Sequence, residues 1–256
     1  MKLLKSYSPA FLIAVFSLGS ISQSFAQVSL FSYEAYTNNE NDTLRYRMLL
    51  SDYAPETRYP LVIFLHGSGE RGDDNEAQLK WGVMNFASDE VMKMHPSIVI
   101  APQCPSNMTW ADYSREDMTL EANPTQPMKL LIGLIEQIKQ QMPVDTSRIY
   151  ITGLSMGGYG TYDAIMRYPD LFAAAVPVCG AGDVTKAAAI AHIPMWIFHG
   201  AHDGAVDSAH SRNMVEALTN AGAHPGYTQY PDAGHFSWIA AYSDPMLMNW
   251  LYSQHK

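Results

Sequence analysis

The stretch Gly153-Leu154-Ser155-Met156-Gly157 has the residue types and spacing of a nucleophilic serine site. It follows a short apolar run that predicts a strand, and it precedes a helical pattern over residues 156–168. In such a G-x-S-x-G turn the glycines permit a strained bend that exposes the serine hydroxyl. The N–H groups at the start of the next helix point to the same place and favour a developing anion. We therefore predict that Ser155 is a nucleophile, rather than a surface serine in a glycine-rich turn.

A serine hydroxyl becomes a good nucleophile when a base takes its proton, and histidine has a suitable pKa. Among the nine histidines, His235 lies in the loop after the last predicted strand, and it is the predicted base. The position of His66 suggests that it holds its loop, and His199 ends a strand, where it would bond the backbone. The spacing of His199 and His202 beside Asp203 also fits a metal site. Because histidine-rich turns usually satisfy backbone groups, we predict no metal.

The base in turn needs an acid that fixes its tautomer and stabilises its charged form. Asp203 follows the predicted strand 195–198 and is the predicted acid. The chain order Ser155, Asp203, His235 is the order of serine, acid and histidine in α/β-hydrolases. Asp207 is the alternative acid, although its place beside Ser208 suits the N-cap of the next helix better.

An oxyanion hole needs two N–H donors. The residue after the nucleophile supplies one of them, which makes the Met156 N–H the first predicted donor. The second comes from the loop after the strand 61–65, where we predict the Ser68 N–H, with Gly67 as the alternative.

Five further side chains are candidates for substrate contact. The aromatic residues among them could stack on an aromatic acyl group or a sugar, or could equally be core or rim residues. The charged pair could bind substrate, although an ion pair that shapes the oxyanion loop is the favoured interpretation. The candidates are Trp110, Tyr159, Trp238, Glu70 and Arg71.

Strands and helices alternate along the chain, which predicts a mostly parallel sheet with helices on both faces. The short, continuous apolar runs are typical of strands buried on both faces. Strands are expected at 30–36, 44–50, 61–65, 98–101, 149–152, 173–178, 195–198 and 227–230, and helices at 128–142, 156–168, 208–221 and 239–252, the last interrupted near Pro245.

Composition narrows the class of protein. Hydrophobic residues are 47% and charged residues 16% of the 256, so the chain is globular and not disordered. The net charge of −9 argues against nucleic acid or an anionic membrane surface as a partner, since both need a basic patch. Two cysteines are too few for a disulfide framework.

The first 26 residues have the pattern of a secretory signal peptide. Lys2 and Lys5 precede an apolar stretch over 11–21, and Ser24-Phe25-Ala26 is a suitable cleavage site. The alternative, an uncleaved membrane anchor, is disfavoured because a span needs about 20 residues. We predict cleavage near Ala26, no stable membrane insertion, and one exported catalytic domain over 27–256, either periplasmic or extracellular.

The motifs together resemble the α/β-hydrolase superfamily over essentially the whole of residues 27–256. Within it, Phe64-Leu65-His66-Gly67-Ser68-Gly69-Glu70-Arg71-Gly72 and Ala101-Pro102-Gln103-Cys104-Pro105 look like the esterases related to polyhydroxybutyrate depolymerases, feruloyl esterases and dienelactone hydrolases. The resemblance implies an eight-stranded, mostly parallel sheet, no cofactor, and an acyl-enzyme on Ser155. Dienelactone hydrolases often have a cysteine nucleophile, so Ser155 favours ordinary esters.

Only about 15 residues separate the strands 173–178 and 195–198, where a cap domain is often inserted. Little or no cap is therefore expected, and an open site suits a bulky or polymeric substrate. Cys104 and Cys179 follow strands that the usual order separates by two others, or about 14 Å, whereas a disulfide needs Cα atoms within about 7 Å. We therefore favour unbridged cysteines.

The predicted function is an exported serine carboxylesterase, acting on acetyl or feruloyl esters of plant polysaccharide. Two alternatives stay open. The first is a serine peptidase of the same fold, which the absence of a gating domain disfavours. The second is a catalytically inactive module that binds carbohydrate, which the intact set Ser155, Asp203 and His235 disfavours.

Overall fold

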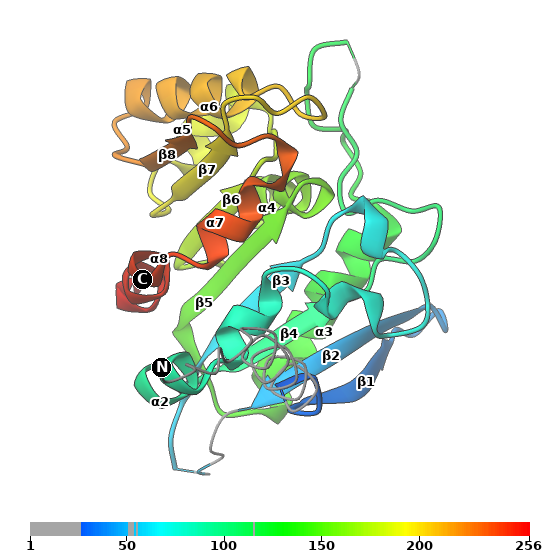
Figure 1. Cartoon of the computed structure of the whole chain (residues 1–256). Coiled ribbons are helices and arrows are strands. Elements are labelled where there is room, and N and C mark those ends of the chain that lie inside the picture. The colour runs from blue at the N-terminus through cyan, green and yellow to red at the C-terminus, as the bar shows by residue number, and fades with distance from the viewer. Residues whose placement is uncertain (1–26, 51–53, 55, 115) are drawn as a thin grey trace, which may run out of the picture.

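A single eight-stranded sheet runs through the computed structural model, which describes residues 27–50, 54, 56–114 and 116–256. The strand order is β1-β2-β4-β3-β5-β6-β7-β8 (Figure 1). The first two ladders, β1–β2 and β2–β4, are antiparallel, and the remaining pairs are parallel. The strands are β1 (Phe31–Thr37), β2 (Thr43–Leu50), β3 (Tyr59–Leu65), β4 (Ile98–Pro102), β5 (Val144–Leu154), β6 (Ala174–Val178), β7 (Trp196–Gly200) and β8 (Gly226–Tyr230).

Helices cover both faces of this sheet. Residues of α3, α4, α5 and α6 pack in one hydrophobic cluster, and residues of α7 and α8 pack in the other. The helices are α2 (Asp89–Met94), α3 (Gln126–Gln141), α4 (Met156–Arg167), α5 (Ala187–Ile190), α6 (Ala209–Asn220), α7 (Trp238–Tyr242) and α8 (Pro245–Ser253), with short 3-10 turns η1 (Ser68–Glu70), η2 (Ala77–Leu79), η3 (Val83–Ala87), η4 (Val184–Lys186) and η5 (His235–Ser237).

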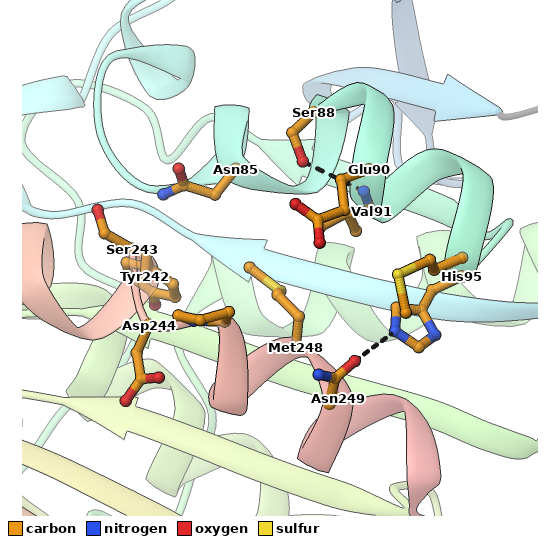
Figure 2. A pocket seen from close by; sticks show the side chains of 12 residues that line it. Asn85, Ser88, Glu90, Val91, His95, Tyr242, Ser243, Asp244, Met248 and Asn249 are labelled. Carbon is orange, nitrogen blue, oxygen red and sulfur yellow. Dashed lines mark hydrogen bonds between the residues drawn. The ribbon is translucent and has the colours of Figure 1, made fainter.

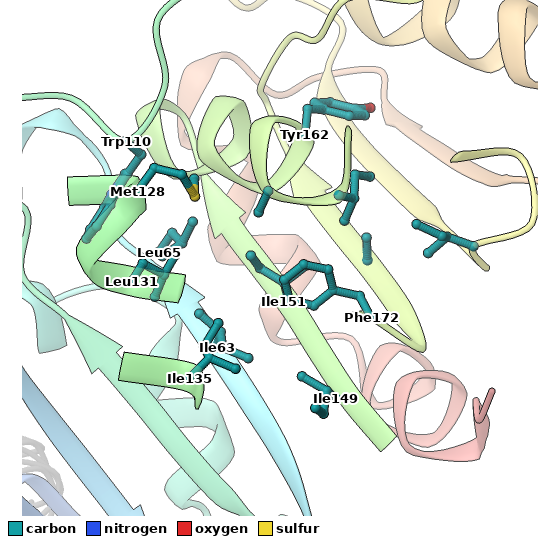
Figure 3. Close-up of a cluster of buried hydrophobic side chains, with 14 of the residues drawn as sticks. Ile63, Leu65, Trp110, Met128, Leu131, Ile135, Ile149, Ile151, Tyr162 and Phe172 are labelled. Carbon is teal, nitrogen blue, oxygen red and sulfur yellow. The ribbon is translucent and has the colours of Figure 1, made fainter. Parts of the chain in front are cut away.

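The central strands are buried on both faces because their side chains alternate between the two clusters. Ile63 and Leu65 of β3 lie with α3 and α4, where Figure 3 shows them beside Leu131. Val62 and Phe64 of the same strand lie in the cluster of α7 and α8. This two-sided burial explains why the strands appear in the sequence as continuous apolar runs.

The eight predicted strands and four predicted helical segments are all present, with ends shifted by a few residues. The last helix is divided as expected, because Pro245 occupies the first turn of α8 and Asp244 caps it. The elements that the sequence does not predict are α2, α5 and the 3-10 turns. Each is too short to show a recognisable helical period of apolar residues. The segment between β6 and β7 holds only η4 and α5, so this region carries little cap.

The long connection between β4 and α3, of which residues 103–114 and 116–125 are described, extends away from the sheet (Figure 1). A bridge between Tyr113 and Leu120 closes it on itself. Arg167 of α4 donates to the carbonyls of Glu121 and Ala122, and its Nε lies 2.8 Å from the buried carboxylate of Asp163. The connection is therefore attached to the helix that follows Ser155.

Both cysteines are free and buried. Cys104 follows β4 and Cys179 follows β6, with β3 and β5 between them, as expected. None of the helices in the described part of the chain is both long and apolar enough to span a bilayer. The predicted signal peptide, residues 1–26, lies outside the described residues.

The contact between β5, α4 and β3 generates a stability prediction. A Cβ on Gly157 would lie 2.0 Å from the carbonyl oxygen of Leu65, and this neighbour is backbone, which cannot rotate away as a flexible side chain can. Gly157→Ala is expected to lower the free energy of unfolding by about 3 kcal/mol. Gly204→Ala is the control, because a Cβ there meets nothing within 4 Å. Urea unfolding of both variants measures the difference, and equal stabilities would contradict this view of the junction.

Candidate active site

Ser155 occupies the turn between β5 and α4 in a strained backbone conformation, with φ 51° and ψ −117°. Its N–H donates to the Val178 carbonyl at the end of β6. Glycine is required around it, since a Cβ on Gly153 would lie 2.4 Å from the Gly157 carbonyl oxygen. The glycines of the motif thus let the turn close tightly, and the serine stands at the carboxyl end of the sheet, where sites form in such folds.

Ser155, His235 and Asp203 are joined by two hydrogen bonds. His235 Nε2 lies 2.9 Å from Ser155 Oγ, and His235 Nδ1 lies 2.7 Å from Asp203 Oδ2. Because a carboxylate only accepts, Nδ1 carries the proton and Nε2 has the free lone pair that faces the serine. The structure therefore brings together the three residues that the sequence predicts, in the geometry of a serine, a base and an acid.

Asp203 is held in place from several directions. Its Oδ1 accepts from the N–H groups of Ala205 and Val206. His199 Nε2 lies 3.3 Å from its Oδ2 and also donates to the Val206 carbonyl. Burial alone would raise the pKa of Asp203, but the hydrogen bonds from Val206, His235 and Ala205 hold it below its ordinary value. The carboxylate is thus ionised and oriented toward His235.

The alternatives to this arrangement do not form. Asp207 accepts from the Ala209 N–H at the start of α6, so it supports the helix. His199 is buried, with its two ring nitrogens engaged by Ser211 and Val206, which is the backbone role that the sequence predicts for it. Within the described residues, His199 and His202 belong to no cluster of metal-ligand atoms.

The loop after β3 is ordered by His66. His66 Nδ1 donates to the Gly67 carbonyl at 2.6 Å, and its Nε2 accepts from the Cys104 N–H at 2.9 Å. In a planar trans peptide the C=O and the following N–H point in opposite directions. Because the Gly67 carbonyl is bonded to His66, the Ser68 N–H faces the other way and stays available for an anion. His66 holds its loop, as its position in the sequence suggests.

The other donor position is at the start of α4. The Met156 N–H is the first of that helix and has no intrahelical acceptor. Ser68 likewise opens the turn η1. Ser68 and Met156 stay our predicted oxyanion donors, with Gly67 as the alternative to Ser68.

A cavity of about 230 Å³ lies beside Ser155 and His235. Three aromatic rings line it and contact one another, with centroids 4.6 to 6.2 Å apart. A carboxyl group and an ammonium group also line it. These five residues are Trp81, Phe236, Trp238, Glu70 and Lys80.

Two of the five predicted substrate residues, Trp238 and Glu70, line this cavity, whereas Tyr159 and Arg71 do not. The predicted substrate contact of Trp110 is wrong, because this residue is fully buried and cannot touch a substrate. Its indole N–H donates to the His66 carbonyl and its ring packs on the His66 ring. Trp110 therefore supports the oxyanion loop from below.

The predicted ion pair between Glu70 and Arg71 is also wrong. Arg71 donates instead to the carbonyls of Ser68 and Met108. Glu70 turns inward, and burial raises its pKa against the opposing effects of Lys80 and of hydrogen bonds, including those from Gly67 and Trp81. Arg71 still shapes the loop, but through backbone carbonyls.

Lys80, Trp81 and Phe236 are absent from the predicted site. The sequence offers a signal for Phe236, which directly follows His235. Lys80 and Trp81 lie ten residues beyond the oxyanion loop, and only the fold of η2 and η3 carries them back to it.

A second cavity, of about 220 Å³, lies between α2 and the segment from α7 to α8 (Figure 2). Its one histidine, His95, stacks on Tyr252 and bonds to Asn249, as Figure 2 shows for the latter pair. No pairing of a nucleophile with a base occurs among its lining residues. The reactive geometry belongs to the first cavity.

The fold and this geometry define the class, an α/β-hydrolase esterase. Residues 53–244 match the family described as phospholipase/carboxylesterase, and the chain belongs to that family. The description of that family names phospholipases and carboxylesterases.

The names of individual relatives and of similar solved structures also describe esterases. A bifunctional acetylxylan esterase/xylanase of Neocallimastix patriciarum is 26% identical over 201 residues, which are 73% of this chain and 27% of that protein. The crystal structure of a thermostable esterase has a TM-score of 0.85 and 39% identity, over 90% of this chain and 64% of that one. The chain thus spans about a quarter of the first protein and under two thirds of the second. A ferulic acid esterase with 18% identity and a TM-score of 0.66, over 87% and 96% of the two chains, shares the fold.

Burial of His66 generates a prediction on pH. Burial lowers the pKa of His66 to about 4, from about 6.5 in an unfolded chain. Between these values the unfolded state binds a proton that the folded state refuses, so acid favours unfolding. From about pH 6.5 down to about pH 4, this histidine alone is expected to remove roughly 3 kcal/mol from the free energy of unfolding.

The variant His66→Gln lacks the titrating group, so its stability should fall less steeply over the same range, although its stability near neutral pH will be lower. Urea unfolding of both proteins at a series of pH values measures the two slopes. Identical slopes would contradict a buried, neutral His66.

Proposed function

We propose that this protein is a serine carboxylesterase that works through an acyl-enzyme on Ser155. His235 takes the proton from the hydroxyl as Ser155 Oγ attacks the ester carbonyl carbon. Asp203 keeps the His235 tautomer and stabilises the charged ring that results. The N–H groups of Met156 and Ser68 hold the oxyanion of the tetrahedral intermediate.

The second half of the reaction uses the same residues. The charged His235 gives its proton to the leaving alcohol, and the acyl group stays on Ser155. His235 then takes a proton from water, which attacks the acyl-enzyme, and returns it to Ser155 Oγ as the acid leaves. One residue, His235, therefore carries out every proton transfer of the cycle.

The observation that carries the proposal is the pair of short hydrogen bonds, 2.9 Å from Ser155 Oγ to His235 Nε2 and 2.7 Å from His235 Nδ1 to Asp203 Oδ2. A serine with ordinary turn geometry needs neither. The strained φ of 51° at Ser155 supports the same conclusion, since such strain costs about 1–3 kcal/mol and concentrates at functional sites.

The proposed substrates are acetyl or feruloyl esters of plant polysaccharide. Relatives whose names include acetylxylan esterase and ferulic acid esterase support this choice. The aromatic cavity and the short segment between β6 and β7 suit an acyl group carried on a polymer. We further propose that residues 1–26 are a signal peptide cleaved near Ala26, and that the protein acts outside the cytoplasm.

Replacing the nucleophile tests the mechanism. Ser155→Ala is expected to lower kcat for 4-nitrophenyl acetate by about 10⁴-fold or more, with unchanged thermal unfolding. A fluorophosphonate probe, followed by peptide mass spectrometry, should modify Ser155 alone, and His235→Ala should lose this adduct. The exposed Ser253 provides the matched control, since Ser253→Ala should behave as the original protein.

Activity that survives in Ser155→Ala would overturn the mechanism. An activated serine that cleaves peptides faster than esters would favour the peptidase alternative. A folded protein that binds glycan and takes no probe would favour the binding module.

Replacing the acid tests the role of Asp203. In Asp203→Asn the side chain has almost the same shape, but its amide no longer stabilises the Nδ1–H tautomer or the charged ring of His235. The expected result is a fall in kcat of about 10⁴-fold with a smaller change in KM. Asp207→Asn is the control and should keep its kcat; a large loss there instead would reverse the assignment of the acid.

A further inference from the structure

Cys179 lies directly behind the predicted triad. It follows β6, is completely buried, and has φ +40°, a conformation that non-glycine residues rarely adopt. Its N–H donates to the Phe198 carbonyl of the neighbouring strand β7. The proposed mechanism gives the thiol no role.

The thiol is close to two other ligand atoms. One atom each from Cys179, Asp203 and His235 lie within 4.8 Å of one another. In a tetrahedral zinc site, N, O and S donors lie roughly 3.5 Å apart, so the three atoms need to move by only about 1 Å. A thiolate, a carboxylate and an imidazole are suitable ligands for Zn²⁺ and Cd²⁺.

We propose that Cys179, Asp203 and His235 form an inhibitory site for a thiophilic divalent cation such as Zn²⁺ or Cd²⁺. Cys179 coordinates as the thiolate, Asp203 through one carboxylate oxygen, and His235 through Nδ1. Water takes the fourth position. The occupied site has no net charge, since the cation carries +2 and the thiolate and carboxylate −1 each, whereas the empty site carries the −1 of Asp203; the ion therefore leaves no uncompensated charge in a buried place.

The protons balance as follows. Binding releases the thiol proton of Cys179 to solvent, because only the thiolate coordinates. The Nδ1 proton of His235 moves to Nε2 as the metal takes its place. His235 then has no lone pair facing Ser155 and cannot act as the base. Burial opposes binding, since it raises the pKa of the Cys179 thiol to about 12, but a bound cation favours the thiolate directly.

The chain offers a matched control. Cys104 is the other free and buried cysteine, and burial raises the pKa of its thiol to about 12 as well. Cys104 belongs to no cluster of metal-ligand atoms within the described residues. Cys179→Ala and Cys104→Ala therefore remove comparable thiols, of which only one lies by the triad.

The inhibition rests on the proposed function, but the binding does not. Cleavage of 4-nitrophenyl acetate is measured with increasing CdCl₂ or ZnCl₂, and inhibition should be reversed by EDTA. Cys179→Ala should remain active and need at least about tenfold more metal for half-inhibition, whereas Cys104→Ala should be inhibited like the original protein. Equal inhibition of the two variants would overturn the proposal.

A second measurement needs no activity. Titration of the Ser155→Ala protein with Cd²⁺ should produce an ultraviolet thiolate-to-cadmium band that saturates at one ion per chain. The double variant that carries both Ser155→Ala and Cys179→Ala should lack this band. If Cys179→Ala fails to fold, Cys179→Ser replaces it in both assays. A band without any esterase activity in the original protein would leave the metal site standing and reject the proposed function. An active esterase with no Cys179-dependent band would reject the metal site alone.

Discussion

Ser155 has positive φ because the turn between β5 and α4 is pressed against the ends of β3 and β6. A Cβ on Gly157 would meet the Leu65 carbonyl, and one on Gly180 would lie 2.5 Å from the Gly158 backbone. Glycines on both sides of the contact let three chain segments approach closely enough to hold the serine in its strained conformation. The cost of about 1–3 kcal/mol is offset by the two-sided core beneath it. The conformation of Ser155, our proposed nucleophile, is thus a product of the packing of the sheet.

The loop that carries Ser68, our proposed oxyanion donor, depends on a second set of contacts, which joins the loop after β3 to the loop after β4. His66 bonds both loops, and Gln103 donates to the Glu70 carbonyl while accepting from the Asn75 N–H. Trp110 closes the set from below through its indole N–H. These side chains are buried, so they rigidify the loop without facing the substrate.

Three histidines divide the work according to their burial. His66 and His199 are buried and have lowered pKa values, so both stay neutral and act as fixed hydrogen-bonding groups. His235 keeps 22% of its side chain exposed and lies between an acid and a hydroxyl. Only this histidine can both exchange protons with solvent and reach Ser155. Cys179 is buried behind His235, and the cation that we propose for this place binds the same imidazole ring.

The sequence by itself determined the class of fold, the serine turn and the order of the triad, because each depends on a local pattern. Apolar runs predict strands buried on both faces, and Ser155 and Asp203 each follow such a strand, whereas His235 follows the edge strand β8. Tertiary structure alone decided which side chains face the cavity. Trp110 is buried under His66, Arg71 bonds backbone carbonyls instead of Glu70, and Trp81 reaches the site from a distant turn. The physical reason is that a side chain's role in a loop depends on which other loops pack against it, and those contacts join residues far apart in the chain.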